Sequence, residues 1–350
     1  MSEPDIDAFF RAAVKQQASD ILITAGIPVV LRINGALVNT STPPLDAKRA
    51  RDLVYSVLRS DQIAKFEQER ELDFSITVQG AHRFRGNAFW QRKSVAAAFR
   101  LIQARIPPLD SLGLPPIMEE LALAPQGLLL FTGPTGQGKS TTQASMIDRI
   151  NSVKRQHIIT VEDPIEYLHT SQLSVIEQRE VGDDTPTFAS ALKHVLRQDP
   201  DVILIGEMRD LETIGAAITA AETGHLVLAT LHTNDSVQAI DRLLDVFPPH
   251  QQGQVRTQLA LALIAVISQR LLPRVSDAKL VCVVEVLIAN AAVRNLIREG
   301  KTHQVYSIME THAKEGMRTM DQALKDLYFK GTIAYEEASK RMRNPSDLRR

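Results

Sequence analysis

Eight consecutive residues near the middle of the chain have the pattern of a phosphate-binding loop, Gly133-Pro134-Thr135-Gly136-Gln137-Gly138-Lys139-Ser140. They follow an apolar, strand-like segment, residues 127–132, and precede a polar, helix-like segment that begins at Thr141. In such a loop the glycines let backbone N–H groups converge on phosphate oxygens, the lysine places a positive charge beside the β- and γ-phosphates, and the serine hydroxyl binds Mg²⁺. A glycine-rich turn that only caps a helix is the alternative. The strand and helix on either side favour a nucleoside triphosphate site formed by residues 134–141, with Ser140 on the metal.

Acidic residues follow two other apolar segments that have the pattern of buried strands. Glu207 comes one glycine after residues 202–205, and Glu162 and Glu166 follow residues 158–161. Because ligands collect at the carboxyl ends of strands in open parallel sheets, we expect these carboxylates to meet the triphosphate. Glu207 is predicted to bind Mg²⁺ rather than to cap the next helix. A solvated turn is the alternative for the second group, but its place after a strand favours Glu166, and next Glu162, as the residue that orients the attacking water.

Histidine and arginine side chains complete the set of candidates. His232 follows the fourth apolar segment, residues 226–229, and is predicted to sense the γ-phosphate, whereas His225 precedes that segment and is expected at the opposite edge of the sheet. Arg85 and Arg100 lie in the first part of the chain, where an exposed strand arginine is most often only solvated. If that part of the chain folds over the nucleotide, both can neutralise transition-state charge as arginine fingers.

Length, net charge and cysteine content limit the classes of protein to which the chain can belong. A chain of 350 residues is long enough for two domains, and a formal net charge of −1 provides no global basic field for binding nucleic acid. The single cysteine, Cys282, excludes a disulfide or a multi-cysteine zinc site within one chain and fits a reducing cytoplasm. The longest apolar stretch, residues 259–267, is far shorter than the roughly 20 residues of a membrane span. With no signal-peptide pattern at the N-terminus, we expect membrane association only through a partner.

Hydrophobic periodicity divides the chain into two α/β parts. Residues 1–103 read as a mixed α/β domain with antiparallel strands, residues 104–116 as a stiff proline-rich linker, and residues 117–350 as a parallel-sheet domain that is helical from about residue 290. In the first part the predicted strands are 21–24, 29–33, 37–39, 72–78, 83–91 and 95–101, with a hairpin at Asn34-Gly35, and the predicted helices are 5–17, 46–58 and 62–69. In the second part the predicted parallel strands are 128–131, 158–161, 202–205 and 226–229, and the C-terminal helices are 291–299, 321–330 and 335–343.

On these residues the chain resembles the secretion ATPases, and among them most closely the type IV pilus retraction ATPases, the PilT-like group. The similar segments, in chain order, are 18–26, 83–89, the phosphate loop 133–140, an acidic box 160–167, a magnesium box 199–210, a histidine box 221–233, and 292–299. The last of these, Ala-Val-Arg-Asn-Leu-Ile-Arg-Glu, is similar to the signature of the retraction branch. Because the matches occur in order along nearly the whole chain, the resemblance is specific.

The resemblance implies a PAS-like N-terminal domain, a RecA-like P-loop motor and a homohexameric ring that hydrolyses ATP with Mg²⁺. In such a ring the active sites lie between subunit domains, and turnover changes the angle between the two domains. The motor would drive pilin subunits back into the inner membrane through a platform protein, with an accessory retraction ATPase as a possible further partner. The expected location is cytoplasmic and peripheral at the inner membrane, through that partner.

Two residues depart from the family pattern. Gln137 stands where a serine is usual and Val293 where an isoleucine is usual. Since Gln137 leaves the loop glycines and Lys139 in place, we expect nucleotide binding to survive and turnover to be the property that changes.

Pilus-extension and type II secretion ATPases typically carry a four-cysteine zinc module, which this chain cannot form. A secretion-system or accessory member of the retraction-like group stays as an alternative, and so does a RecA-like nucleic-acid translocase, against which the neutral net charge counts.

Overall fold

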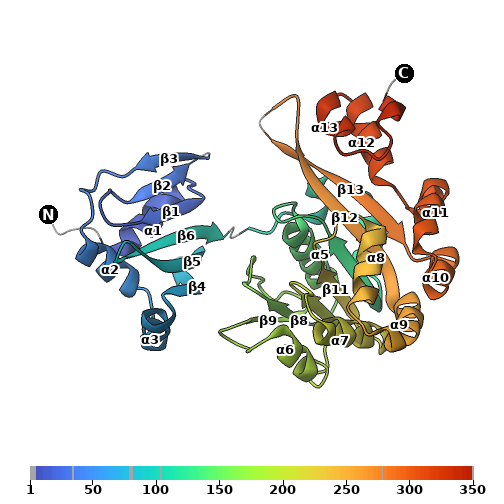
Figure 1. Ribbon diagram of the computed structural model, residues 1–350, viewed down its shortest axis with the longest axis horizontal. Coiled ribbons are helices and arrows are strands. Elements are labelled where there is room, and N and C mark those ends of the chain that lie inside the picture. The colour runs from blue at the N-terminus through green and yellow to red at the C-terminus, as the bar shows by residue number, and fades with distance from the viewer. Residues whose placement is uncertain (1–4, 34, 79–81, 103–104, 278, 349–350) are drawn as a thin grey trace. The chain divides into compact units, whose positions relative to one another are not determined.

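The computed structural model describes residues 5–33, 35–78, 82–102, 105–277 and 279–348, and the chain forms two compact units, Met1–Arg105 and Ile106–Arg350 (Figure 1). Asn34 of the predicted hairpin and the predicted domain boundary at residues 103 and 104 lie outside the described residues. The mixed α/β class predicted for both parts is confirmed. No described helix has the combined length and apolar character needed to cross a membrane.

The first unit is a six-stranded antiparallel sheet with three helices. The strand order is β3-β2-β1-β6-β5-β4, and the bounds are α1 (Ile6–Lys15), β1 (Asp20–Ile23), β2 (Val30–Ile33), β3 (Ala36–Asn39), α2 (Ala47–Tyr55), α3 (Ser60–Glu69), β4 (Glu71–Val78), β5 (His82–Gln91) and β6 (Ser94–Ile102). Period-two alternation on β5 buries Phe84 and exposes Arg85, as predicted. Phe10 of α1 packs against Phe84 and Phe99, with ring centroids 4.6 and 5.1 Å away, and these rings centre the core of the unit.

The second unit is a seven-stranded sheet in the order β13-β12-β7-β11-β10-β8-β9. Its strands are β7 (Gly127–Thr132), β8 (His157–Glu162), β9 (Val175–Glu180), β10 (Val202–Ile205), β11 (Leu226–Thr230), β12 (Leu263–Pro273) and β13 (Leu280–Ile288). All neighbours are parallel except β12 and β13, which form a long antiparallel pair. The four parallel strands that the apolar runs predict are therefore confirmed.

Helices cover both faces of this sheet, which is why β7, β10 and β11 are buried at every position and mostly apolar. The helices are α4 (Ile117–Ala122), α5 (Lys139–Val153), α6 (Phe188–Val195), α7 (Leu211–Glu222), α8 (Ser236–Asp245), α9 (Pro249–Ala262), α10 (Ala291–Arg298), α11 (Val305–Thr311), α12 (Met320–Phe329) and α13 (Tyr335–Ser339). On β7, Leu128 and Leu130 enter the core shared with α6 to α9, whereas Leu129 and Phe131 enter the core shared with α4 and α5. A short 3₁₀ helix, Leu109–Leu112, buries Leu109 in the latter core.

Strands β9, β12 and β13 are absent from the sequence prediction. The apolar run 259–267 contains the last turn of α9 and the first half of β12, and a continuous apolar run does not by itself distinguish a buried helix from a buried strand. The chain passes from Ala262 of α9 directly into Leu263 of β12, with no turn residue between them. In Figure 1 the β12 and β13 pair extends from the sheet toward α12 and α13.

Candidate active site

The phosphate loop begins where β7 ends at Thr132 and runs into the first turn of α5. Gly133 has φ of +135°, and a Cβ at this position would lie 2.5 Å from the Gln269 carbonyl oxygen of β12. Only glycine fits there, because a side chain would collide with the backbone of the neighbouring strand. Thr135 and Gly136, at the tip of the loop, are exposed, as is Ser140 in the first turn of α5. The loop therefore presents its tip and a helix N-terminus to solvent, the arrangement that binds phosphate.

Lys139, the first residue of α5, is held inside the loop. Its side chain is buried, with 6% of the residue exposed, and Nζ donates hydrogen bonds to the carbonyl oxygens of Gly133 at 2.7 Å and Pro134 at 2.8 Å. Burial lowers the pKa of Lys139, and the nearby Glu207 carboxylate opposes that shift. The ammonium group and the Glu207 carboxylate thus act on each other across the site.

Gln137, one of the two residues that depart from the family pattern, connects the loop to β12. Its side-chain Oε1 accepts a hydrogen bond of 2.7 Å from the Leu271 N–H. Strand β12 pairs with β7 only as far as Ser268, opposite Thr132, so Leu271 lies beyond the end of β7. Gln137 supplies the Leu271 N–H with an acceptor at a position that β7 does not reach. A sequence pattern that looks only at the glycines and the lysine does not reveal this contact.

We expect Gln137→Ala to reduce the free energy of unfolding by about 1 kcal/mol, because the partly buried Leu271 N–H loses its acceptor. Urea unfolding of the full chain measures the change. Gln172→Ala is the control, since the Gln172 side chain makes only an exposed hydrogen bond of 3.2 Å to Asp148, and surface changes of this kind usually stay within about 0.5 kcal/mol. An equal loss in both variants would contradict the anchoring role.

Glu207 lies just past the end of β10 and has two basic neighbours. Arg209 binds it through both carboxylate oxygens, at 2.7 Å each, and His232 Nε2 lies 3.1 Å from Oε1. Burial pushes the pKa of Glu207 upward, but the hydrogen bonds and charges of Arg209 and His232 outweigh it and the pKa is lowered. Glu207 is therefore an ionised carboxylate, the form that binds a divalent cation. Arg209 is a partner that the sequence prediction did not include, although its position two residues after Glu207 is visible in the chain.

The ends of β8 and β10 approach each other closely at Gly206. A Cβ on Gly206 would lie 3.1 Å from the Glu162 Cα and 3.3 Å from the Val161 carbonyl oxygen, and the Gly206 N–H donates to that oxygen at 2.8 Å. A larger residue would separate the two strands. Glycine here lets the backbone at the end of β8 lie against the backbone that follows β10.

Glu162 and Glu166 occupy different surroundings. Glu162 ends β8 and accepts hydrogen bonds from Thr160 Oγ1 at 2.7 Å and Gln178 Nε2 at 3.2 Å. Burial raises its pKa to about 7, against the effect of these bonds. Glu166 is exposed, and its backbone N–H donates to Glu162 Oε2 at 3.4 Å. Gln178, on β9, also donates to the Tyr167 carbonyl oxygen at 2.8 Å. A strand that was not predicted from the sequence therefore holds both Glu162 and the backbone at Tyr167 in place.

Two side-chain contacts join the loop and α5 to the neighbouring strand ends. Thr132 Oγ1 lies 2.6 Å from both the carbonyl oxygen and Oγ1 of Thr233, which follows His232. Thr141 Oγ1 lies 2.8 Å from the hydroxyl of Tyr167, the last residue of the acidic box, residues 160–167. These contacts place the phosphate loop, the acidic box and residues 232–233 at one edge of the sheet. His225 is at the other edge, as expected, because it precedes Leu226, which pairs with Gly127 at the start of β7.

Arg85 and Arg100 lie on adjacent strands of the first unit, directly opposite each other in the register of β5 and β6. Arg100 Nε is 3.0 Å from Asp20 Oδ1, and its side chain is 74% exposed. Arg85 is also exposed. Both guanidinium groups are on the surface of their unit, and the arginine-finger role stays a prediction.

A central strand that ends in a phosphate loop, with an ionised glutamate and a histidine at the ends of neighbouring strands, defines a P-loop NTPase of RecA-like architecture. The chain belongs to the type II/IV secretion system protein family, whose sequence model matches residues 1–282.

Individual proteins of this family are similar over almost the whole chain. The type IV pilus retraction ATPase PilT of Pseudomonas aeruginosa is 44% identical over 344 residues, which cover 98% of this chain and 100% of that protein. A twitching motility protein of Neisseria gonorrhoeae is 46% identical over 91% of this chain and 85% of that one. The crystal structure of the pilus retraction motor PilT with bound ADP is similar with a TM-score of 0.93 at 49% identity, covering 99% of each chain. The predicted resemblance is confirmed.

Proposed function

We propose that this protein hydrolyses Mg·ATP and uses the energy to retract type IV pili. The observation that carries the proposal is that the phosphate loop, His232, Glu207 and Glu162 stand at the carboxyl ends of four parallel strands of one sheet, with Lys139 and His232 both interacting with Glu207. The similarity to retraction ATPases supports the cellular role. We further propose that residues 1–103 form a PAS-like domain, that residues 104–116 link it to the motor in residues 117–350, and that Arg85 and Arg100 act as arginine fingers.

Each residue of the site has a role in this chemistry. The backbone of residues 134–141 would bind the phosphates, and Lys139 would exchange its contacts with the Gly133 and Pro134 carbonyl oxygens for phosphate oxygens. Ser140 and Glu207 would hold Mg²⁺, which neutralises charge on the phosphates and is typically bound by few protein ligands plus phosphate oxygens. His232, held beside Glu207, would contact the γ-phosphate.

The structure favours Glu162 over Glu166 as the residue that accepts the proton of the attacking water. Glu162 is fixed by Thr160 and Gln178, and its pKa of about 7 is close to the operating pH, where a general base is most effective. Glu166 is exposed and follows Glu162 by one turn of the loop. This assignment reverses the order of preference predicted from the sequence, which placed Glu166 first.

We expect the rate of ATP hydrolysis at saturating ATP to rise about tenfold between pH 6 and pH 8, because only ionised Glu162, with its pKa near 7, can accept a proton. Above pH 8 the rate should be flat, since the group is then fully ionised. Phosphate release across this range measures the profile. Glu162→Gln should abolish the rise, and Glu166→Gln should leave it in place. A rise that survives in Glu162→Gln and disappears in Glu166→Gln would assign the base to Glu166.

We propose a homohexamer that acts at the inner membrane through a platform protein, with an accessory retraction ATPase as a possible further partner. Deletion of the gene tests the direction of movement. Retraction predicts excess surface pili and loss of twitching motility, which complementation should reverse. Cells without pili would instead indicate assembly, and normal pili with normal motility would favour a secretion-system role.

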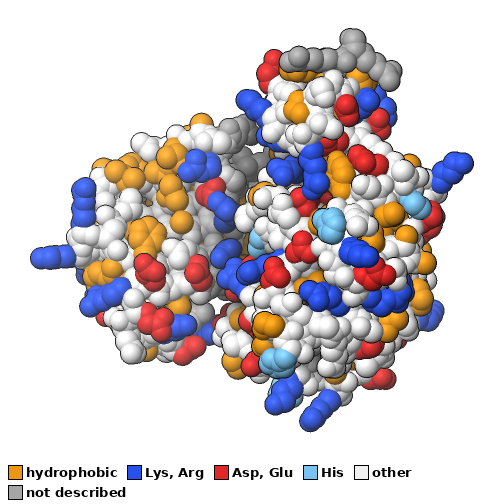
Figure 2. Space-filling model, turned by 45° about the vertical axis from the view of Figure 1, so that its right-hand side comes forward, with side chains coloured by type: hydrophobic (Ala, Val, Ile, Leu, Met, Phe, Trp, Pro, Cys, Tyr) orange, Lys and Arg blue, Asp and Glu red, His pale blue; other side chains and the backbone are white. Residues whose placement is uncertain are grey.

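A nucleic-acid translocase is the second candidate on fold alone. Lysine and arginine side chains are interspersed with aspartate and glutamate on the face of the molecule in Figure 2, in keeping with the net charge of −1. Filter binding at low salt separates the candidates. Tight DNA retention that is lost as salt rises would favour translocation, and we expect none.

A further inference from the structure

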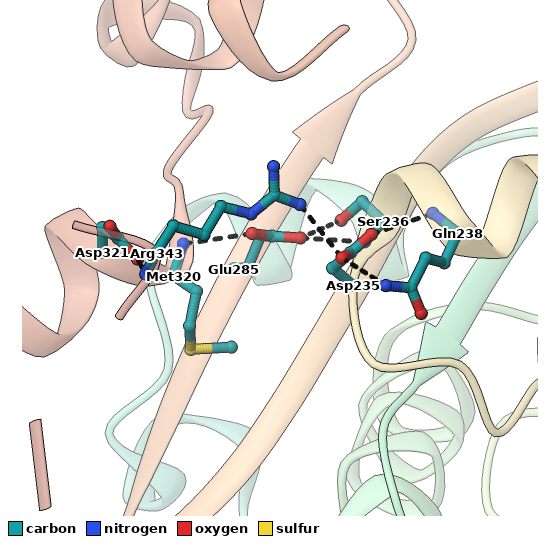
Figure 3. A network of polar contacts seen from close by, with 7 residues as sticks. All are labelled: Asp235, Ser236, Gln238, Glu285, Met320, Asp321 and Arg343. Carbon is teal, nitrogen blue, oxygen red and sulfur yellow. Dashed lines mark hydrogen bonds and ion pairs between the residues drawn. The ribbon is translucent and has the colours of Figure 1, made fainter. Parts of the chain in front are cut away.

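Glu285, on β13, is a buried carboxylate outside the proposed site, with 2% of the residue exposed. Its Oε1 accepts hydrogen bonds from the Ser236 N–H at 2.9 Å and the Ser236 hydroxyl at 2.7 Å, and its Oε2 accepts one from the Met320 N–H at 3.1 Å (Figure 3). Ser236 and Met320 are the first residues of α8 and α12. One carboxylate therefore joins the N-termini of two helices, where negative charge is favourable.

The α8 side of this contact leads directly to His232. Glu285 holds Ser236 at one end of the segment that follows His232, and Thr132 holds Thr233 at the other. Glu285 and Thr132 lie in one cross-strand row, since each is directly opposite Ser268 of β12. The segment that follows His232 is thus hydrogen-bonded at both ends, at Thr233 to Thr132 of β7 and at Ser236 to Glu285 of β13. The position of His232 depends on these bonds.

The α12 side leads to the end of the chain. Asp321, in the first turn of α12, accepts hydrogen bonds from the Arg343 and Asn344 N–H groups, both at 2.9 Å. The Arg343 guanidinium reaches Asp235, the residue that caps α8, at 3.0 Å (Figure 3). It also lies over the Tyr306 ring, 4.0 Å from the ring centroid. The C-terminal segment, residues 318–348, is therefore connected to α8 in two ways, through the buried Glu285 of β13, which bonds to both Met320 and Ser236, and through the exposed Arg343–Asp235 ion pair.

We propose that Glu285 is a positioning residue that couples the C-terminal segment, residues 318–348, to the segment that follows His232. Displacement of the C-terminal segment would then change the rate of ATP turnover. The inference rests on the proposed ATPase function. Glu285 is suited to this role because a buried carboxylate that loses a donor is unfavourable, and withdrawal of Met320 would pull the carboxylate away from Ser236.

Glu285→Gln tests the coupling, because an amide of the same shape has one acceptor oxygen and cannot accept at both helices. We expect kcat to fall about tenfold or more, as expected when a bond to a charged group is lost, while KM and ADP affinity stay within about twofold. Hydrogen exchange of residues 233–238 should accelerate by a similar factor. Unchanged kcat and unchanged exchange would overturn the proposal.

A second variant, Asp321→Asn, perturbs only the C-terminal end, since the Asp321 carboxylate bonds to the backbone of Arg343 and Asn344. Coupling predicts about threefold faster exchange at 233–238 in the full chain, and no further acceleration when Glu285→Gln is already present, because the two changes act through one contact. Additive effects in the double variant would overturn the proposal. If Glu285→Gln does not fold, Ser236→Ala replaces it, and because the Ser236 N–H bond to Glu285 remains, the acceleration caused by Asp321→Asn should then be smaller than in the otherwise wild-type chain.

Thr187→Ala is the matched control. Thr187 caps α6 of the same unit by accepting from the Ser190 N–H at 3.0 Å, outside this network. We expect exchange at 233–238 to stay within about twofold of wild type, and equal acceleration would mean that general destabilisation, not coupling, is being measured. Absence of ATP turnover in the wild-type chain would refute the proposed function, whereas the exchange measurements would still decide the coupling.

Discussion

Lys139→Ala should reduce kcat/KM for ATP by a factor of roughly 30 to several thousand and weaken nucleotide binding in the same proportion. Removing a buried, hydrogen-bonded charge that pairs with another charge typically costs about 2–5 kcal/mol, and each 1.4 kcal/mol corresponds to about tenfold. Lys139 meets those conditions, since its ammonium is buried inside the loop, is bonded to the Gly133 and Pro134 carbonyl oxygens and interacts with the Glu207 carboxylate. Titration with a fluorescent ADP analogue and a phosphate-release assay give the two quantities.

Lys154→Ala provides the control for this experiment. Lys154 follows the same helix, α5, and its Nζ also donates to a backbone carbonyl oxygen, that of Leu123 at 2.8 Å. It lies at the helix end that is farther from the loop. Nucleotide affinity should be unchanged in this variant. Loss of affinity in both variants, or retention in both, would remove the phosphate-binding role from Lys139.

Glu207→Gln should leave nucleotide affinity within a few-fold of wild type and reduce kcat about a thousandfold. The amide keeps the shape of the side chain but loses the charge that would hold Mg²⁺, whose electrostatic contribution to the transition state is worth several kcal/mol, or about tenfold per 1.36 kcal/mol. The low pKa of Glu207, set by Arg209 and His232, means that wild type carries this charge throughout the neutral range.

Glu177→Gln is the corresponding control, because Glu177 on β9 also pairs with a histidine, His157, at 3.5 Å. This pair lies outside the proposed site and its carboxylate is more than half exposed. Turnover in Glu177→Gln should equal that of wild type. If Glu207→Gln turned over at the wild-type rate, Mg²⁺ would have to be held by other groups and the proposed site would be wrong.

Sequence patterns identified the strands that deliver the site, because each is a short apolar run with polar residues directly after it. The phosphate loop between β7 and α5 and the position of Glu207 after β10 follow from such local patterns. The strand β12 does not, since the helix α9 and strand β12 share one uninterrupted apolar run. A local pattern contains no information about which strand an apolar residue will pair with.

Glycine spacing, strand periodicity and the order of the polar residues that follow each strand are properties of neighbouring residues, and they were enough to determine the class of fold and to predict a candidate nucleotide site. The tertiary structure alone decided the surroundings of each charged group. Burial and the side chain of Gln178 from β9 distinguish Glu162 from Glu166, and Leu271 from β12 gives Gln137 its partner. The reason is physical: the pKa and hydrogen bonds of a side chain depend on residues that are distant in the chain and that only folding brings within a few ångströms.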